Sequence, residues 1–112
     1  MAYAIGDVVL VPFPFTDLSE IRVRPAVVVS AELFNQETRD VTVAMITSQP
    51  RLGATDWGLR EWSEAGLKLP SWMRARFVTL DQSLIRFSPG HLSRRDLEAV
   101  QDRIRLALGL GN

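Results

Sequence analysis

The sequence predicts a mainly β protein: a small barrel of short strands followed by one C-terminal amphipathic α-helix. Short runs of β-forming residues recur along most of the chain, with turn signals about every 8–12 residues between them, and this spacing favours a barrel over a βαβ sheet. Near the C-terminus the apolar residues change to helical spacing. The chain has 112 residues, and we expect one domain over 1–112 without a linker or internal repeat.

Each expected element has a local signal. Runs of apolar and β-branched residues predict strands, and clusters of polar residues, Gly and Pro predict turns. The expected strands are 6–15, 25–30, 41–47, 75–81 and 84–87, with a short one near 57–61; helical turns are expected over 31–40 and near 62–66, and polar loops over 16–24 and 48–53. Pro12 and Pro14 cannot donate to a ladder, so the first strand should end or lie at a sheet edge there. Pro25 is tolerated as the first residue of the second strand.

The C-terminal helix has start and stop signals. Ser93 is a good N-cap, and Asp96 occupies the capping-box position, where Glu or Gln is the usual partner. Four apolar residues then fall on one face at helical spacing: Leu97, Val100, Ile104 and Leu108. Gly109 and Gly111 should end the helix.

The composition argues against several kinds of chemistry. The chain has no cysteine, so disulfides and thiolate metal sites are excluded. His91 is the only histidine and the carboxylates are scattered, so we expect no metal site, no serine triad and no cofactor; His91 itself should be a surface residue. No apolar run is long enough to span a bilayer and the N-terminus lacks the pattern of a signal peptide, so we expect a cytoplasmic protein that does not enter a membrane.

The charges are balanced but unevenly distributed among residue types. Net charge is zero, which argues against coating of nucleic acid by bulk charge but leaves room for a local basic site. Twelve arginines stand against the single Lys68. Arginine presents a planar fork of donors that suits phosphate, although a GC-rich genome gives the same bias.

Arg24 and Thr47 stand out because strand pairing would bring them together. If the strands 25–30 and 41–47 pair antiparallel, the start of one meets the end of the other, and the two residues become neighbours at one sheet edge. Spacing alone leaves two interpretations open. In the first, Arg24 is a solvated charge and Thr47 is an ordinary residue at the end of a strand. In the second, the two residues form a functional site together with nearby polar groups: Ser48, Gln49, Asp17 and Glu20.

The order of several motifs resembles one protein family. "GDVVLVPFPFTD", "RPAVVVS", "ITSQ" and "LPSWMRARFVTLDQSLI", followed by a C-terminal helix, are similar to the MazF/PemK toxin endoribonucleases along nearly the whole chain. The resemblance implies an SH3-like β-barrel with appended helices that forms a homodimer. It also implies a type II toxin that cleaves single-stranded RNA sequence-selectively without a metal and is inhibited by a cognate antitoxin, a partner with a DNA-binding part.

The resemblance also implies site residues. The family's catalytic arginine matches Arg24 and its catalytic threonine matches Thr47. The RNA-binding candidates are the residues of the adjoining loops and nearby arginines: Ser48, Gln49, Asp17, Ser19, Glu20, Arg22, Arg51, Arg74 and Arg76. Phe13, Phe15, Trp57 and Trp72 are candidates for stacking on bases, or are core residues.

The chain departs from the family pattern in its short 16–23 loop, its segment 55–73 with three tryptophans, and its neutral charge. The alternative is a non-catalytic binding module of the same fold. Such a protein would resemble relatives that poison DNA gyrase, or would be a degenerate toxin that only binds an antitoxin-like partner.

Overall fold

A computed structural model describes residues 3–14 and 21–111. The candidates Asp17, Ser19 and Glu20 and the stacking candidate Phe15 therefore lie outside the described residues, as does the side chain of Phe13.

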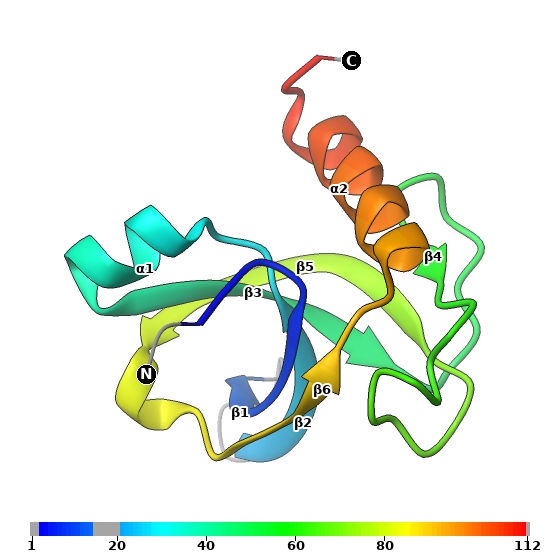
Figure 1. Ribbon diagram of the computed structural model, residues 1–112. Coiled ribbons are helices and arrows are strands. Elements are labelled where there is room, and N and C mark those ends of the chain that lie inside the picture. The colour runs from blue at the N-terminus through cyan, green and yellow to red at the C-terminus, as the bar shows by residue number, and fades with distance from the viewer. Residues whose placement is uncertain (1–2, 15–20, 112) are drawn as a thin grey trace.

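One antiparallel sheet dominates the fold. Its strands are β1 (Asp7–Pro14), β2 (Ile21–Val28), β3 (Asp40–Thr47), β4 (Trp57–Gly58), β5 (Trp72–Asp81) and β6 (Phe87–His91), in the spatial order β4-β5-β3-β2-β1-β6. The sheet is strongly curled (Figure 1), and the expectation of a mainly β, small barrel-like fold with short helices is confirmed. The helix α1 (Glu32–Thr38) connects β2 to β3, the short 3₁₀-helix η1 (Gln82–Leu84) follows β5, and α2 (Arg94–Leu108) follows β6.

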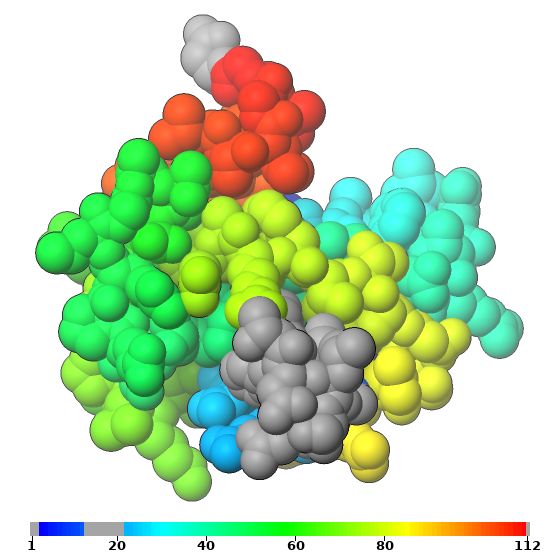
Figure 2. Space-filling view, turned by 180° about the vertical axis from the view of Figure 1, so that it is seen from behind, coloured from blue at the N-terminus to red at the C-terminus, as the bar shows by residue number. Residues whose placement is uncertain are grey.

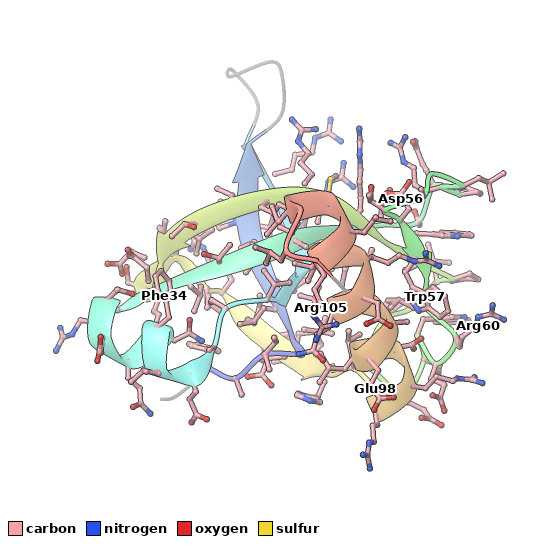
Figure 3. The ribbon with its side chains drawn as sticks, turned by 90° about the horizontal axis from the view of Figure 1, so that it is seen from above. Phe34, Asp56, Trp57, Arg60, Glu98 and Arg105 are labelled. Atoms are coloured by element: carbon pink, nitrogen blue, oxygen red, sulfur yellow. The ribbon has the colours of Figure 1, made fainter. Side chains whose placement is uncertain are left out.

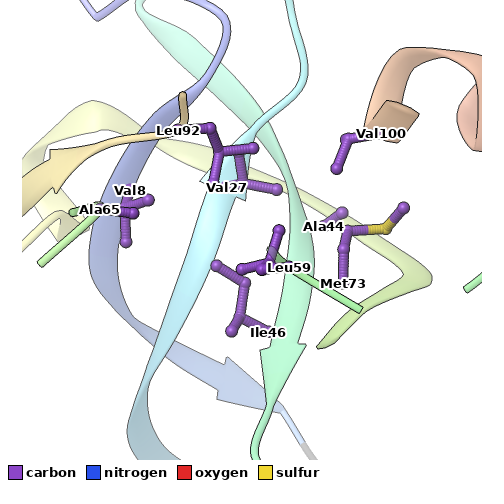
Figure 4. Close-up of a cluster of buried hydrophobic side chains, with 9 residues drawn as sticks. All are labelled: Val8, Val27, Ala44, Ile46, Leu59, Ala65, Met73, Leu92 and Val100. Atoms are coloured by element: carbon purple, nitrogen blue, oxygen red, sulfur yellow. The ribbon is translucent and has the colours of Figure 1, made fainter. Parts of the chain in front are cut away.

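Both faces of the central strands are buried, which explains their unbroken apolar sequence. Val8 and Val27 belong to a cluster on one face, whereas Val9 and Val28 belong to a cluster on the other, because successive side chains of a strand point to opposite faces. Figure 4 shows the first cluster, which is made by Val8, Val27, Ala44, Ile46, Leu59, Ala65, Met73, Leu92 and Val100. Residues of α2 and of the segment before β5 thus cover one face of the sheet.

The second strand begins earlier than expected. β2 starts at Ile21, so residues 21–24 belong to a strand rather than to the expected loop, and Pro25 lies within the strand instead of at its first residue. The polar sequence here reflects pairing on one side only, since Arg22 and Val23 pair with β1 whereas pairing with β3 begins at Ala26. The prolines of β1 fit their expected edge position, because β6 pairs with β1 only as far as Leu10.

Three further expectations need correction. The strand expected at 84–87 is instead β6, which begins at Phe87, and β6 tolerates Pro89 and Gly90 because it is an edge strand. The short strand expected near 57–61 is limited to Trp57–Gly58. Residues 62–66 form turns rather than a helix.

The C-terminal helix agrees with its sequence signals except at two residues. Ser93 caps it by accepting a hydrogen bond from the Asp96 N–H, and Gly109 ends it in the left-handed region. Leu97, Val100 and Ile104 pack on the core, but Leu108 is exposed because it lies beyond the sheet. The Asp96 carboxylate forms no capping box and bonds instead to residues before β5. Within the described residues, no helix has the length and apolar character needed to cross a membrane.

The two helices flank the sheet at separate places. In Figure 1, α2 lies beside β4, and α1 lies at the other end of β3. Figure 2 shows the segment between β3 and β5 (green) on one side of the molecule and α1 (cyan) on the opposite side. Residues of the segment between β3 and β5 line both cavities described next.

Candidate active site

Arg24 and Thr47 line one cavity of about 410 Å³, which we call the Arg24–Thr47 cavity. The ladder between β2 and β3 explains this placement. Ala26 pairs with Met45, and the same antiparallel register, continued by two residues, sets Arg24 opposite Thr47 on one face. The expected proximity is therefore present, although both strands are internal, so the residues meet at the end of the ladder rather than at a sheet edge.

Pro25 matches the point at which this ladder ends. Val29 donates its N–H to the Thr42 carbonyl of β3, so alternate residues of β2, including position 25, direct their backbone nitrogen toward β3. Position 25 lies just beyond the last pair with β3 and needs no N–H there. Proline is thus compatible with the middle of β2 and restricts Arg24 to extended conformations.

The hydroxyl of Thr47 is oriented by its own turn. Thr47 Oγ1 accepts a hydrogen bond from the Gln49 backbone N–H at 3.1 Å, which occupies one acceptor position and leaves the O–H hydrogen available for donation. Ser48 also lines the cavity. Gln49 is exposed, and it is not among the described residues that line the cavity.

Another wall of the cavity comes from the segment just before β5, whose residues were not among the expected site residues. Leu67, Lys68 and Leu69 line the cavity together with Phe87. Gly66 makes this wall possible: its φ is +87°, and a Cβ there would lie 2.6 Å from the Pro89 carbonyl oxygen, so the turn packs directly on the backbone of β6. The stretch "GLKLPS", which directly precedes β5, is the sequence signal that could have identified Lys68.

The charges of the cavity are of one sign. Among the described residues that line it, Arg24 and Lys68 are cationic and none is a carboxylate. Such a cavity favours an anion. In the described ranges no group of three or more His, Asp or Glu side chains is placed to hold a metal ion.

The remaining basic candidates are dispersed. Arg22 is exposed on β2, opposite Phe13, and Arg76 lies where the β3–β5 register shifts. Neither is among the described residues that line a cavity, and the same holds for Arg74. Arg51 lines a second cavity. Arg24, Thr47 and Ser48 thus line one cavity, whereas Arg22 and Arg76 are not among its described lining residues.

The second cavity has a volume of about 430 Å³, and we call it the Trp–Arg cavity. Its main side chains are the three tryptophans and three arginines: Trp57, Trp62, Trp72, Arg51, Arg60 and Arg103. Ser71 lines both cavities, so they are adjacent. Figure 3 shows Asp56, Trp57 and Arg60 together beside α2, away from Phe34 on α1. Trp57 and Trp72, expected to be stacking or core residues, thus line one cavity with Arg51, which was expected to bind RNA.

A buried carboxylate holds the Trp–Arg cavity against α2. Asp96 is fully buried and accepts hydrogen bonds from Trp57 Nε1 at 3.0 Å and from the backbone N–H groups of Arg60 and Glu61, both at 2.9 Å. Arg103 Nη1 donates to the Ala54 carbonyl at 3.3 Å. Two residues of one helix thereby fix the loop that carries the tryptophan.

Comparisons with known proteins decide the family. The family model described as "PemK-like, MazF-like toxin of type II toxin-antitoxin system" matches residues 4–108. This chain belongs to that family. The resemblance of the motifs is therefore confirmed over almost the full length.

Solved structures share the fold of this family member. A mycobacterial endoribonuclease in complex with its cognate antitoxin has a TM-score of 0.83 at 20% identity, covering 99% of each chain. A MazF from Deinococcus radiodurans has a TM-score of 0.77 at 20% identity, covering 97% of this chain and 98% of the other. The Mycobacterium tuberculosis toxin MazF-mt6 has a TM-score of 0.73 at 22% identity, covering 95% and 99%. No curated protein sequence matches significantly.

Proposed function

We propose that this protein is the toxin of a type II toxin–antitoxin system, an endoribonuclease that cleaves single-stranded RNA in the Arg24–Thr47 cavity without a metal ion. The observation that carries the proposal is the pairing of an arginine and a threonine donor in one cavity whose described lining has cations and no carboxylate. Membership of the toxin family supports it.

The chemistry requires little from the protein beyond positioning and charge stabilisation. The ribose 2′-hydroxyl attacks the adjacent phosphorus, and the 5′-oxygen of the next nucleotide leaves, giving a 2′,3′-cyclic phosphate and a 5′-hydroxyl. Arg24 holds two phosphoryl oxygens with its planar fork, and the Thr47 hydroxyl donates to the same oxygens. Donors directed at developing charge contribute about 3 kcal/mol each to lowering the barrier in a site that excludes water. Lys68 adds positive charge from another wall of the cavity.

We assign one proton transfer to the cavity and the other to a carboxylate of the segment that precedes β2 in the sequence. Arginine keeps its proton at neutral pH, since its pKa lies above about 12, so Arg24 is a phosphate stabiliser first and a general acid toward the leaving oxygen second. A general base must come from elsewhere, because no carboxylate is among the described lining residues. Glu20 and Asp17 are the nearest carboxylates in sequence and are our candidates for the base.

The partners follow from the same proposal. The substrate is single-stranded, because A-form duplexes hide their base edges from side chains. We propose a homodimer that acts in the cytoplasm and is inhibited by a cognate antitoxin. One of the similar solved structures, the mycobacterial endoribonuclease, is in complex with its own cognate antitoxin. The cleavage of messenger RNA would then stop translation and growth.

The test uses purified wild type and the variants Arg24→Ala and Thr47→Ala, incubated with a long single-stranded RNA in EDTA. We expect discrete fragments ending in 2′,3′-cyclic phosphate from the wild type. Each substitution should lower the cleavage rate about 100- to 1000-fold, the usual effect of removing one such donor. The matched control is Arg94→Ala, which removes an arginine that is 92% exposed at the start of α2 and should leave the rate unchanged.

Circular dichroism of each variant verifies that it folds. Cleavage that survives both Arg24→Ala and Thr47→Ala would contradict the site assignment. Absence of cleavage by the wild type, together with trapping of DNA gyrase, would establish the binding-module alternative instead.

A further inference from the structure

The Trp–Arg cavity carries more positive charge than the rest of this neutral chain. Arg51, Arg60 and Arg103 line it, and Asp56 is the one carboxylate among its described lining residues. Asp56 Oδ2 already accepts the Gly53 N–H at 3.1 Å. Three guanidinium groups against one engaged carboxylate make the cavity suited to an anionic ligand.

The same cavity presents flat surfaces. Arg60 Cζ and Arg103 Cζ each lie 5.3 Å from the centroid of the Trp57 ring, so the two guanidinium groups pack against the indole. The Trp57 N–H donates to buried Asp96, which fixes the plane of the ring and leaves its N–H unavailable to a ligand. Trp72 adds a second aromatic plane next to Gly58, where a Cβ would come within 2.9 Å of Trp72 Nε1. Unstacked RNA bases bind to aromatic and guanidinium planes of this kind.

One donor of Arg51, a residue that lines the cavity, is unsatisfied. Its Nε is buried and has no hydrogen-bond partner among the described residues. A buried donor without a partner costs about 1–3 kcal/mol. A small rotation of the guanidinium toward an anion in the cavity would satisfy that donor, so a ligand that brings a phosphate would be stabilised.

The Trp–Arg cavity lies next to the Arg24–Thr47 cavity. Ser71 lines both, and the chain passes from Thr47 in the first to Arg51 in the second. Four residues span at most about 14 Å. A stacked RNA strand rises about 3.4 Å per nucleotide, so this distance corresponds to about four nucleotides. An extended RNA strand spans the same distance with fewer nucleotides.

We infer that the Trp–Arg cavity is an RNA subsite that holds one unstacked nucleotide a few positions from the cleaved phosphate. The base packs against the Trp72 and guanidinium planes, and Arg51 binds the phosphate. This inference rests on the proposed RNA cleavage and adds a second point of contact on the same strand. An acidic peptide would use the charges but not the flat surfaces, so we favour the nucleotide.

The binding test does not depend on cleavage. Full-length protein labelled with ¹⁵N on its tryptophan indoles is titrated with 5′-AMP, GMP, CMP and UMP, and separately with inorganic phosphate and a Glu-rich peptide. The indole signals are assigned by single Trp→Phe variants. We expect at least one mononucleotide to shift the signals of Trp57 and Trp72, with phosphate producing a smaller shift at the same concentration. Arg51→Gln should weaken that binding about 10- to 100-fold, as expected for loss of a charged hydrogen bond.

The matched control Arg94→Gln removes an arginine outside the cavity and should bind the nucleotide like the wild type. Arg103→Gln provides a second variant of the cavity if Arg51→Gln does not fold. Equal shifts with phosphate and nucleotides would reduce the cavity to a simple anion site and overturn the inference. A response to the Glu-rich peptide but not to nucleotides would assign it to a protein partner, and no response to any probe would also overturn it.

The two proposals fail separately. Arg24→Ala should lose RNA cleavage yet keep the nucleotide-induced shifts of Trp57 and Trp72. Conversely, Arg51→Gln should raise the KM for a long RNA and alter which sequences are cut, as read by sequencing the fragments. Nucleotide binding by a wild type that cuts no RNA would contradict the proposed function alone.

Discussion

The two cavities of this protein adjoin at Ser71 but are built differently. The Arg24–Thr47 cavity depends on the backbone ladder between β2 and β3, which sets one strand against the other. The Trp–Arg cavity depends on side chains of α2, chiefly Asp96 and Arg103, which hold an irregular loop. A site on paired strands tolerates changes in single side chains nearby, whereas a site on a loop depends on the few contacts that hold it.

Asp96→Ala is the strongest test of this difference. The change leaves the N–H groups of Trp57, Arg60 and Glu61 without their acceptor. A buried donor that loses its acceptor costs about 1–3 kcal/mol, so with three donors affected the free energy of unfolding in urea should fall by at least about 3 kcal/mol. If the variant stays folded, the indole signal of Trp57 should move toward that of free tryptophan, while RNA cleavage at Arg24 persists.

The matched control is Glu98→Ala on the same helix. Glu98 is exposed, and among the described residues its one ion pair is with exposed Arg94, so its loss should change stability by less than about 1 kcal/mol. A cleavage rate that falls in parallel with the Trp57 change would mean that the two cavities do not behave as separate units.

Gly66→Ala should disturb the Arg24–Thr47 cavity instead. An alanine at φ +87° is strained, and its Cβ would lie 2.6 Å from the Pro89 carbonyl oxygen, so the wall that contains Lys68 must shift. Gly109→Ala is the matched control, because its φ is +68° and nothing lies within 4 Å of the added Cβ. Backbone strain costs about 1–2 kcal/mol in both variants, and overpacking adds about 1–3 kcal/mol in Gly66→Ala alone.

The measurements are urea unfolding and the rate of RNA cleavage. We expect the rate to fall in Gly66→Ala and to stay at the wild-type value in Gly109→Ala. Equal stability losses in the two variants would show that the close packing of Gly66 on β6 adds nothing to the strain.

The difference between the cavities also explains what the sequence could predict. The strand runs and the chain length between them were enough to bring Arg24 and Thr47 together, because antiparallel pairing is a local rule that connects adjacent strands. The start of β2 was misplaced because polar residues such as Arg22 can pair on one side while facing solvent on the other.

The Trp–Arg cavity lay beyond prediction from sequence for a different reason. Asp96 and Trp57 are 39 residues apart, and nothing in the helical pattern distinguishes a carboxylate that caps its own helix from one that bonds to a distant loop. Lys68 was missed likewise, since its place in the same cavity as Arg24 depends on the close approach of Gly66 to β6. Contacts of this kind depend on the three-dimensional arrangement and have no periodic signal.

Asp81→Asn is expected to have the smallest effect and tests whether the far end of the same strands is independent of both cavities. Asp81 pairs with Asp40 at one end of the β3–β5 ladder, and Thr47 pairs with Trp72 at the other. The Ser83 hydroxyl and N–H donate to the Asp81 carboxylate and hold its pKa below the ordinary value of 3.8, with Arg39 adding to this effect.

Because the pKa is lower in the folded state, the charged carboxylate stabilises the fold above the unfolded-state pKa, and this contribution is lost as the pH falls through the folded-state pKa. Asparagine also caps a helical turn, so Asp81→Asn should be only slightly less stable than the wild type at pH 7. The difference between the urea midpoints of the two proteins should become smaller as the pH falls toward 3. A gap that widens on acidification would contradict the lowered pKa, and a changed cleavage rate at pH 7 would show that the two ends of the ladder are coupled.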